Sequence, residues 1–374
     1  MRARGTSICG GTCRRMATSE RRILRSHTSV RAIRPDEVTS GMRAAVLCGI
    51  GSWTPPDVIT NERLARALHT SEEWIRNRTG IELRHVASPG IATSDLAVEA
   101  GQRALKSAGL DAVDALVLAT TTPDRPCPAT APEVASRLGL GPIAAFDVAA
   151  VCTGFIYALA NGAGLIAAGI ADRVLVIGAE VFTGILNPRD HATRVIFGDG
   201  AGAAVLRGGS AAEIGAIGPF TLGSDGRGAD LITVAVGGSR LPYGRADGTE
   251  SKRYLSMAGQ SVYRRAIDVM TQSSERVLEL ADWPVSAVDW LVCHQANRRI
   301  LTAVAARLGI PADQCLINID QVGNTAAASI PLALADGALS GALRTGDRIV
   351  LTGFGGGLTW GSAVLRWPDI VCGN

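Results

Sequence analysis

The segment Asp172–Gly178 reads DRVLVIG, and the segment Asp347–Gly353 reads DRIVLTG. The agreement extends outward in one order: AVDALVL (Ala112–Leu118) returns as AVDWLVC (Ala287–Cys293), VASRLGL (Val134–Leu140) as VAARLGI (Val304–Ile310), and GAAVLR (Gly202–Arg207) as GSAVLR (Gly361–Arg366). Because the spacing between corresponding segments stays nearly constant, the chain contains two copies of one unit rather than a short-period repeat.

Each copy alternates short, β-branched strands with helical segments such as APEVASRLGL and NRRILTAVAARLGI. This alternation is typical of crossover units around buried, mostly parallel sheets. Two such units with helices packed between them predict an α/β fold of five layers, αβαβα. We therefore divide the chain into a leader (1–41), a first half (42–213) and a second half (214–374), and we expect a site where corresponding loops of the halves meet.

Composition excludes several classes of function. Of the 374 residues, 19% are charged and the net charge is +3, which gives no basis for binding nucleic acid. The most apolar stretch, residues 155–171, is interrupted by Asn161 and several glycines and is too short to span a bilayer. The eight cysteines are scattered, as is typical of a reducing compartment, so we expect a cytoplasmic protein.

Residues 1–41 differ in composition from the rest of the chain. They hold nine arginines against Glu20, Asp36 and Glu37, and they lack an apolar run long enough for a secretory signal. We favour a disordered leader or an upstream start, since Met16 and Met42 are both possible starts. The alternative is an organellar transit segment, which would place the protein in a plastid.

Cys152 ends the apolar run Phe146–Cys152 (FDVAAVC) and precedes a helix-compatible segment rich in small residues. By itself such a cysteine is most often a core residue. The second copy, however, has Asn324 in the equivalent GNTA corner, and it has His294 after a strand where the first copy has Ala119. This constellation favours a nucleophile at the start of a helix, whose dipole should lower the pKa of the thiol and favour thiolate.

The residues around this cysteine indicate acyl transfer. His294 as a neutral imidazole and Asn324 as an amide are donors that suit stabilising an enolate, although either could be structural. The glycines 355–357 permit close backbone approach, so that N–H groups of this loop and of Cys152 could bind an oxyanion. A thiol with two neutral donors and no carboxylate base suits acylation of sulfur followed by decarboxylative carbon–carbon bond formation. We expect no metal and no nicotinamide site, because the glycine-rich strings lack the full dinucleotide spacing.

Five segments together, DVAAVCTGF, HQANRRI, GNTAAASIP, IFGDGAGAAVL and GFGGGLTWGSA, resemble β-ketoacyl-acyl-carrier-protein synthase III of the thiolase superfamily. The resemblance runs from about Met42 to Trp367. It implies a thiolase-like homodimer that is acylated by an acyl-CoA and then condenses the acyl group with malonyl-acyl carrier protein (malonyl-ACP) to a 3-oxoacyl-ACP. Both compounds are substrates, so the resemblance implies no cofactor.

The resemblance also implies roles for single residues. Cys152 is the acylated nucleophile, His294 and Asn324 polarise the malonyl thioester carbonyl, and the amides of Cys152 and Gly356 form an oxyanion hole. Further positions carry over as follows: Phe354 and Cys127 to the acyl pocket, Trp74, Arg78, Gly259 and Asn297 to coenzyme A and its pantetheine arm, and Arg264 and Arg299 to the acidic carrier protein.

Two positions depart from the family pattern. His191 stands where the best-known members carry an arginine at the coenzyme A mouth, which puts that nucleotide contact in doubt. Cys127 stands where a bulky aromatic of the partner subunit closes the pocket of acetyl-specific members, so we expect a primer larger than acetyl. The alternatives are a priming ketosynthase or an acyltransferase of the same fold in polyketide or secondary metabolism, and a non-catalytic module that only binds acyl-CoA or carrier protein.

Overall fold

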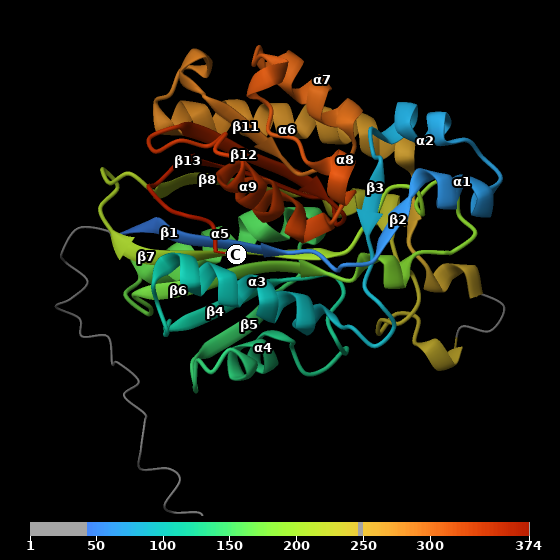
Figure 1. The fold of residues 1–374 in the computed structure, drawn as a ribbon, viewed down its shortest axis with the longest axis horizontal. Coiled ribbons are helices and arrows are strands. Elements are labelled where there is room, and N and C mark those ends of the chain that lie inside the picture. Colours follow the sequence, from blue (N-terminus) through green and yellow to red (C-terminus); the bar gives the residue numbers. More distant parts are fainter. Residues whose placement is uncertain (1–42, 246–249, 374) are drawn as a thin grey trace, which may run out of the picture. The chain divides into compact units, whose positions relative to one another are not determined.

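The computed structural model of the protein describes residues 43–245 and 250–373 (Figure 1). The strands are β1 (Ala44–Trp53), β2 (Val58–Thr60), β3 (Leu83–His85), β4 (Ala115–Ala119), β5 (Ala144–Val148), β6 (Arg173–Glu180), β7 (Gly200–Gly209), β8 (Ala216–Ser224), β9 (Ile232–Thr233), β10 (Ser256–Met257), β11 (Trp290–Cys293), β12 (Arg348–Gly355) and β13 (Thr359–Arg366). The helices are α1 (Asn61–Leu68), α2 (Glu72–Thr79), α3 (Thr93–Ala108), α4 (Ala131–Arg137), α5 (Gly154–Ala167), α6 (Gly259–Ala281), α7 (Arg298–Leu308), α8 (Ile319–Val322) and α9 (Ser329–Leu339). The expected leader lies outside the described residues.

The two copies follow the same strand order. Within the described residues a nine-stranded sheet has the order β11-β12-β13-β8-β1-β7-β6-β4-β5. The first copy contributes β1-β7-β6-β4-β5 and the second contributes β8-β13-β12-β11. The strands β8, β13, β12 and β11 thus have the same spatial order as their counterparts β1, β7, β6 and β4. The equivalent of β5 is reduced in the second copy to a parallel bridge between Leu291 and Cys315. This repeated topology confirms the duplication that the sequence predicts.

The prediction of mostly parallel sheets is wrong. Parallel pairing is found between β4 and β5, β4 and β6, and β11 and β12, whereas the other neighbouring strands of this sheet are antiparallel. The reason is that β7 follows β6, and β13 follows β12, without a crossover helix between them. A connection without a crossover helix can return the chain beside the last strand in the opposite direction, and both of these connections do so.

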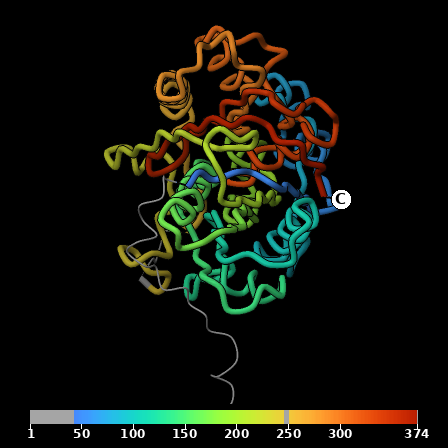
Figure 2. Tube along the Cα trace, turned by 90° about the vertical axis from the view of Figure 1, so that its left-hand side faces the viewer, coloured from blue at the N-terminus to red at the C-terminus, as the bar shows by residue number. Residues whose placement is uncertain are grey.

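Helices cover the strands in the five layers that the sequence predicts. α3 and α4 pack on the outer face of the first copy, α6 and α7 on the outer face of the second, and α5 and α9 lie between the two sets of strands (Figures 1 and 2). Strand β4 shows how both faces become buried: Ala115, Val117 and Ala119 pack into the central layer, while Leu116 and Leu118 pack under α3 and α4.

The two central helices begin at equivalent sharp corners. α5 follows the 3-10 turn Val151–Thr153, and α9 follows the 3-10 turn Ala326–Ala328. Val151 (φ +48°) and Ala326 (φ +45°) both adopt the left-handed region, which is unfavourable for a residue with a Cβ atom. The corners also touch, since a Cβ added at Gly154 would lie 3.2 Å from a methyl group of the second turn. Loops from both copies therefore meet at the centre of the fold.

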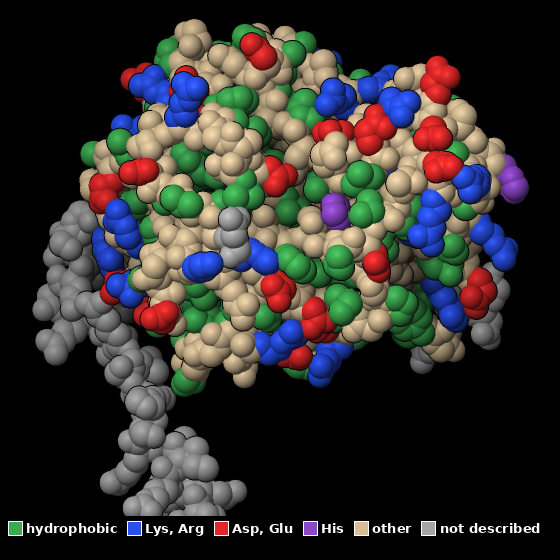
Figure 3. All heavy atoms as spheres, viewed as in Figure 1, with side chains coloured by type: hydrophobic (Ala, Val, Ile, Leu, Met, Phe, Trp, Pro, Cys, Tyr) green, Lys and Arg blue, Asp and Glu red, His purple; other side chains and the backbone are tan. Residues whose placement is uncertain are grey.

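The surface agrees with the composition. On the face shown in Figure 3, basic and acidic side chains are interspersed and no continuous basic area forms. Among the helices of the described residues, none is long and apolar enough to cross a membrane.

Candidate active site

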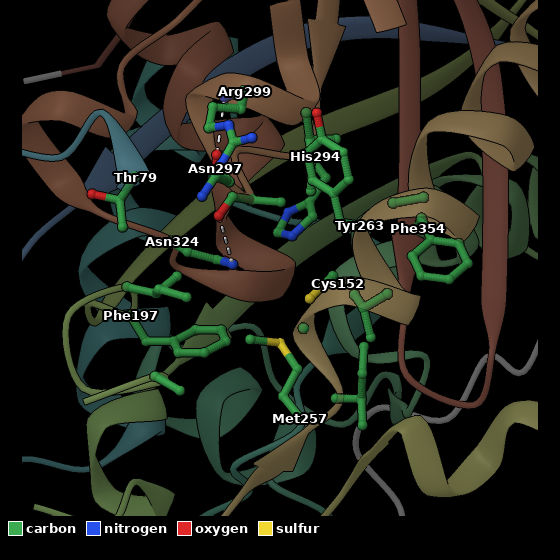
Figure 4. Close-up of a pocket in the computed structure, with 18 of the residues that line it drawn as sticks. Thr79, Cys152, Phe197, Met257, Tyr263, His294, Asn297, Arg299, Asn324 and Phe354 are labelled. Atoms are coloured by element: carbon green, nitrogen blue, oxygen red, sulfur yellow. Dashed lines mark hydrogen bonds between the residues drawn. The ribbon is translucent and has the colours of Figure 1, made fainter. Parts of the chain in front are cut away.

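A cavity of about 680 Å³ runs from the central corners to the surface between α2, α6 and α7. Its buried lining includes Cys152, His294, Asn324 and Phe354, and its exposed lining includes Arg78, Arg264 and Arg299. No Asp or Glu of the described residues lines it. Figure 4 shows the Cys152 sulfur, the His294 ring and the Asn324 amide turned toward the same space. The structure therefore brings together the three side chains that the sequence selects for catalysis.

Cys152 lies in the 3-10 turn before α5, and 7% of the residue is exposed. Phe182, Phe197 and Ala326 pack around it, so the thiol faces an apolar end of the cavity. The unfavourable backbone of Val151, which precedes it, directs the chain abruptly from β5 into α5. Such strain at a corner is typical of residues that are held for function.

The predicted lowering of the pKa of Cys152 is wrong. Burial raises the pKa of this thiol well above its ordinary value, and the nearby Glu180 carboxylate raises it further. The backbone N–H of Cys152, which faces its own sulfur, acts in the opposite direction but is a smaller effect. The resting nucleophile is therefore a neutral thiol, which loses its proton during the reaction.

His294 follows β11 and is almost completely buried. Its backbone N–H continues the β11–β12 ladder by donating to the carbonyl of Thr352 at 2.8 Å. Its Nδ1 lies 2.7 Å from the hydroxyl oxygen of Ser329. Burial lowers the pKa of His294 to about 3, so the imidazole is neutral near pH 7. This agrees with the neutral donor that the sequence predicts.

Asn324 is held by both its backbone and its side chain. Its N–H donates to the carbonyl of Ile196 at 2.9 Å, and its own carbonyl accepts from Gly198 at 3.0 Å. The side-chain Oδ1 accepts the N–H of Ala326 at 2.9 Å, which fixes the amide plane. The Nδ2 group reaches the carbonyl of Ala296 only at 3.5 Å (Figure 4), which leaves this donor free to bind a substrate oxygen.

The glycine-rich loop approaches the nucleophile through Gly355. A Cβ at this position would lie 2.8 Å from the backbone nitrogen of Cys152, so a larger residue would displace the corner. The next residue, Gly356, packs against Val151, where an added Cβ would lie 3.3 Å from the valine side chain. The oxyanion-hole role of Gly356 stays a prediction.

The mouth of the cavity is organised by Asn297, the N-cap of α7. Its Oδ1 accepts the N–H of Arg299 at 2.9 Å, and its Nδ2 donates to the carbonyl of Arg78 at 3.0 Å. Arg78 lies over the ring of Trp74 and Arg299 over the ring of Tyr263, each 5.5 Å from the ring centroid. Asn297 therefore ties the backbone of α2 to that of α7, and the rings of Trp74 and Tyr263 support the two guanidinium groups at the opening.

Most of the other predicted site residues line the cavity, and some do not. Gly259 lies in its wall, at the start of α6. Trp74 is 39% exposed and is connected to the cavity through Arg78. Cys127 is exposed and outside the lining, so a role in the acyl pocket requires the partner subunit. His191 is exposed next to the lining residue Ala192.

Sequence reasoning missed three features of the site. Phe182 and Phe197 stack beside Cys152, with ring centroids 4.4 Å apart. Glu180, the last residue of β6, is completely buried, and burial raises its pKa to about 7. Ser329 contacts His294. The sequence carried no signal for Ser329, because aligning VCTG with GNTA sets Gly154 opposite Ala326, and only the helix starts of the structure pair Ser329 with Gly154.

Known proteins share both the sequence and this architecture. Residues 146–226 match the family model described as 3-Oxoacyl-[acyl-carrier-protein (ACP)] synthase III, and residues 278–367 match the model of its C-terminal part. The chain is 59% identical over 330 residues to β-ketoacyl-[acyl-carrier-protein] synthase III 3 of Streptomyces coelicolor, covering 88% of this chain and 98% of that protein.

Solved structures agree. The crystal structure of 3-oxoacyl-(acyl carrier protein) synthase III from Pseudomonas aeruginosa superposes with a TM-score of 0.84 at 51% identity, covering 88% of this chain and 100% of that chain. A priming β-ketosynthase of a polyketide biosynthetic pathway superposes with a TM-score of 0.82 at 32% identity, covering 88% and 97%. The chain thus belongs to the β-ketoacyl-[acyl-carrier-protein] synthase III family of thiolase-like, acyl-transferring condensing enzymes.

Proposed function

We propose that the protein condenses an acyl group from acyl-CoA with malonyl-ACP to give a 3-oxoacyl-ACP. In the first step the sulfur of Cys152 bonds to the acyl carbonyl carbon, the bond to the coenzyme A sulfur breaks, and the thiol proton leaves with free coenzyme A. In the second step the malonyl group loses CO₂, and the resulting enolate carbon attacks the acyl carbonyl. The bond to Cys152 breaks, and the released thiolate takes up a proton.

The observation that carries this proposal is the position of Cys152, His294 and Asn324 at the buried end of a cavity with arginines at its exposed end. A pantetheine arm is long and neutral and ends in anionic phosphate, which suits an apolar passage with a basic mouth. The neutral imidazole and the free amide N–H can both donate to an enolate oxygen. These donors act in the decarboxylative step, whereas acylation depends on the thiol.

The acyl primer is proposed to be larger than acetyl. The support from sequence is the small side chain of Cys127 where an aromatic closes the pocket of acetyl-specific members. Within one chain the space beside Cys152 is bounded by Phe182 and Phe197 instead. In this proposal the longest acyl chain that fits is set by these two rings and by the side chains, such as Cys127, that a second subunit contributes to the pocket.

A homodimer is part of this proposal. Strand β5 is the last strand of the sheet, and its residues are half-buried or, at Ala144, exposed, whereas those of its neighbour β4 are all buried. Phe146 and Val148 thus leave apolar surface at an open edge, which a second copy could cover. The exposed Cys127 lies in the segment between β4 and α4. We also propose a cytoplasmic location, as the cysteine usage indicates.

The experiment is a condensation assay with malonyl-ACP and a panel of acyl-CoAs from acetyl to octanoyl, with the mass of the carrier-protein product as readout. We expect a 3-oxoacyl-ACP and the highest turnover with a primer longer than acetyl. Cys152→Ser should abolish the product, and Cys48→Ser, a half-buried cysteine outside the cavity, should not. Faster turnover with acetyl-CoA than with every longer primer would reject the primer proposal.

The same assay separates the alternatives. An acylated Cys152 without any condensation product would favour an acyltransferase. No adduct and no product with any primer would favour a non-catalytic binding module. Because a priming ketosynthase of a polyketide pathway has the same fold, the fold does not distinguish a fatty-acid role from a polyketide role. The primer that the protein prefers in the assay is the observation that bears on this choice.

A further inference from the structure

The hydrogen bond between His294 and Ser329 decides what the catalytic imidazole can do. A neutral imidazole carries one proton, either on Nδ1 or on Nε2, and the partner of one nitrogen sets the state of the other. Nδ1 of His294 is 2.7 Å from the Ser329 hydroxyl oxygen, and both side chains are buried. If Nδ1 holds the proton, Nε2 presents a lone pair. If Nδ1 accepts, Nε2 carries an N–H that can donate to a substrate carbonyl.

The surroundings of Ser329 favour acceptance by Nδ1. Its hydroxyl oxygen already accepts the backbone N–H of Gln295 at 3.3 Å. The hydroxyl has a single proton to donate. In the described part of the chain the one side-chain or backbone acceptor bonded to this hydroxyl is Nδ1 of His294. The hydroxyl proton is therefore directed at Nδ1, which favours the ring proton on Nε2; the backbone of Ala326 is a further acceptor beside the ring.

Gln295 holds this geometry in place. Its side-chain Nε2 donates to the carbonyls of Cys293 and Leu316 at 2.8 and 3.2 Å, and its Oε1 accepts the N–H of Asn318 at 3.1 Å. The backbone that follows His294 is thus fixed on both sides. The backbone N–H of Gln295, which donates to the Ser329 hydroxyl, is therefore held in its orientation by the side-chain hydrogen bonds of Gln295.

Comparison of the two copies gives an independent argument. The sequence repeat aligns His294 with Ala119 after equivalent strands, and the structure pairs Ser329 with Gly154 as the first residues of the two central helices. In the first copy the two positions are closely packed, because a Cβ at Gly154 would lie 3.0 Å from the Cβ of Ala119. The second copy thus carries a hydrogen-bonded histidine and serine at two positions that are alanine and glycine in the first copy.

We propose that Ser329 is a positioning residue that donates its hydroxyl proton to Nδ1 of His294 and so keeps an N–H on Nε2 toward the cavity. The proposal rests on the proposed function, in which His294 donates to the malonyl thioester carbonyl. It predicts that Ser329 matters for condensation and much less for acylation of Cys152.

The first test is the tautomer of His294 in the wild-type protein, read from imidazole ¹⁵N chemical shifts with a His294→Gln variant for assignment. We expect a protonated Nε2 and an unprotonated Nδ1. A protonated Nδ1 would overturn the proposal. This readout needs no substrate, so it stands even if the protein proves to use other substrates than those proposed.

The second test separates the two steps in variants. Ser329→Ala should slow condensation about 10- to 100-fold while acylation of Cys152 changes little, because it removes a hydrogen bond that orients a catalytic group. Ser329→Thr keeps a hydroxyl and should restore most of the rate. Ser362→Ala removes another fully buried serine hydroxyl outside the cavity and serves as the matched control. Equal losses in acylation and condensation for Ser329→Ala would reject a selective positioning role.

Discussion

Replacing Glu180 by glutamine should change the pH dependence of stability. The carboxylate is fully buried at the end of β6 and accepts hydrogen bonds from the Thr121 N–H at 3.0 Å and the Thr122 hydroxyl at 2.8 Å. These bonds favour the ionised form, but burial outweighs them and raises the pKa from 4.5 to about 7. Ionising this group therefore costs more in the folded protein than in the unfolded chain.

The sign and size follow from linkage. Since the folded-state pKa lies above the unfolded value, the folded protein binds more protons between pH 4.5 and about 7, and stability falls as the pH rises through this interval. One pKa unit corresponds to about 1.4 kcal/mol, so the full loss is about 3 kcal/mol. About 2 to 3 kcal/mol of it falls between about pH 5 and about pH 8.

The assay is urea unfolding of the wild type and of Glu180→Gln at these two pH values. The free energy of unfolding of the wild type, relative to that of the variant, should fall by about 2 to 3 kcal/mol from the lower to the higher pH. Glu279→Gln, at a side chain that is 66% exposed, should leave the pH dependence of the wild type unchanged. Parallel pH profiles for the wild type and Glu180→Gln would refute the reasoning.

Three other positions give tests of the site. Burial lowers the pKa of His294 from 6.5 to about 3, so the free energy of unfolding should fall by about 5 kcal/mol as the pH drops through this interval. His294→Gln should lose that part of the acid dependence in urea titrations. A pH profile of the variant equal to that of the wild type would contradict this prediction. Phe182→Ala should lower the free energy of unfolding by about 3 to 5 kcal/mol and favour longer primers, and an unaltered chain-length preference would count against its place in the acyl pocket. Gly355→Ala places a methyl group 2.8 Å from the backbone nitrogen of Cys152 and should slow acylation of Cys152 about 100-fold, as measured by mass spectrometry. Gly164→Ala has open space around the new methyl group and should leave the acylation rate unchanged. Normal acylation of Gly355→Ala would refute the close approach of Gly355 to Cys152.

The sequence predicts the layers of the fold because the duplicated strands and helices keep their order. It does not predict strand direction, since DRVLVIG and DRIVLTG read alike whether the next strand returns directly or after a helix. The antiparallel β7 and β13 follow from connections without a covering helix, which strand periodicity does not encode.

The same division applies to the site. Cys152, His294 and Asn324 could be selected because the repeat places their loops at equivalent corners. The pKa of Cys152 could not be predicted, because it depends on burial among Phe182 and Phe197 and on the charge of Glu180, which tertiary packing brings close. The position of Cys152 at a helix start, considered alone, predicts a lowered pKa instead of a raised one.

The central claim is that Cys152 carries the acyl group and that Asn324 acts only in the condensation step. The direct measurement is the mass of the Cys152 peptide after loading with acyl-CoA and again after malonyl-ACP is added, in the wild type and in Asn324→Ala. We predict an acyl adduct in both proteins that malonyl-ACP removes from the wild type and leaves on the variant. An unacylated Cys152 in the wild type, or an adduct that malonyl-ACP clears equally from both proteins, would contradict the account.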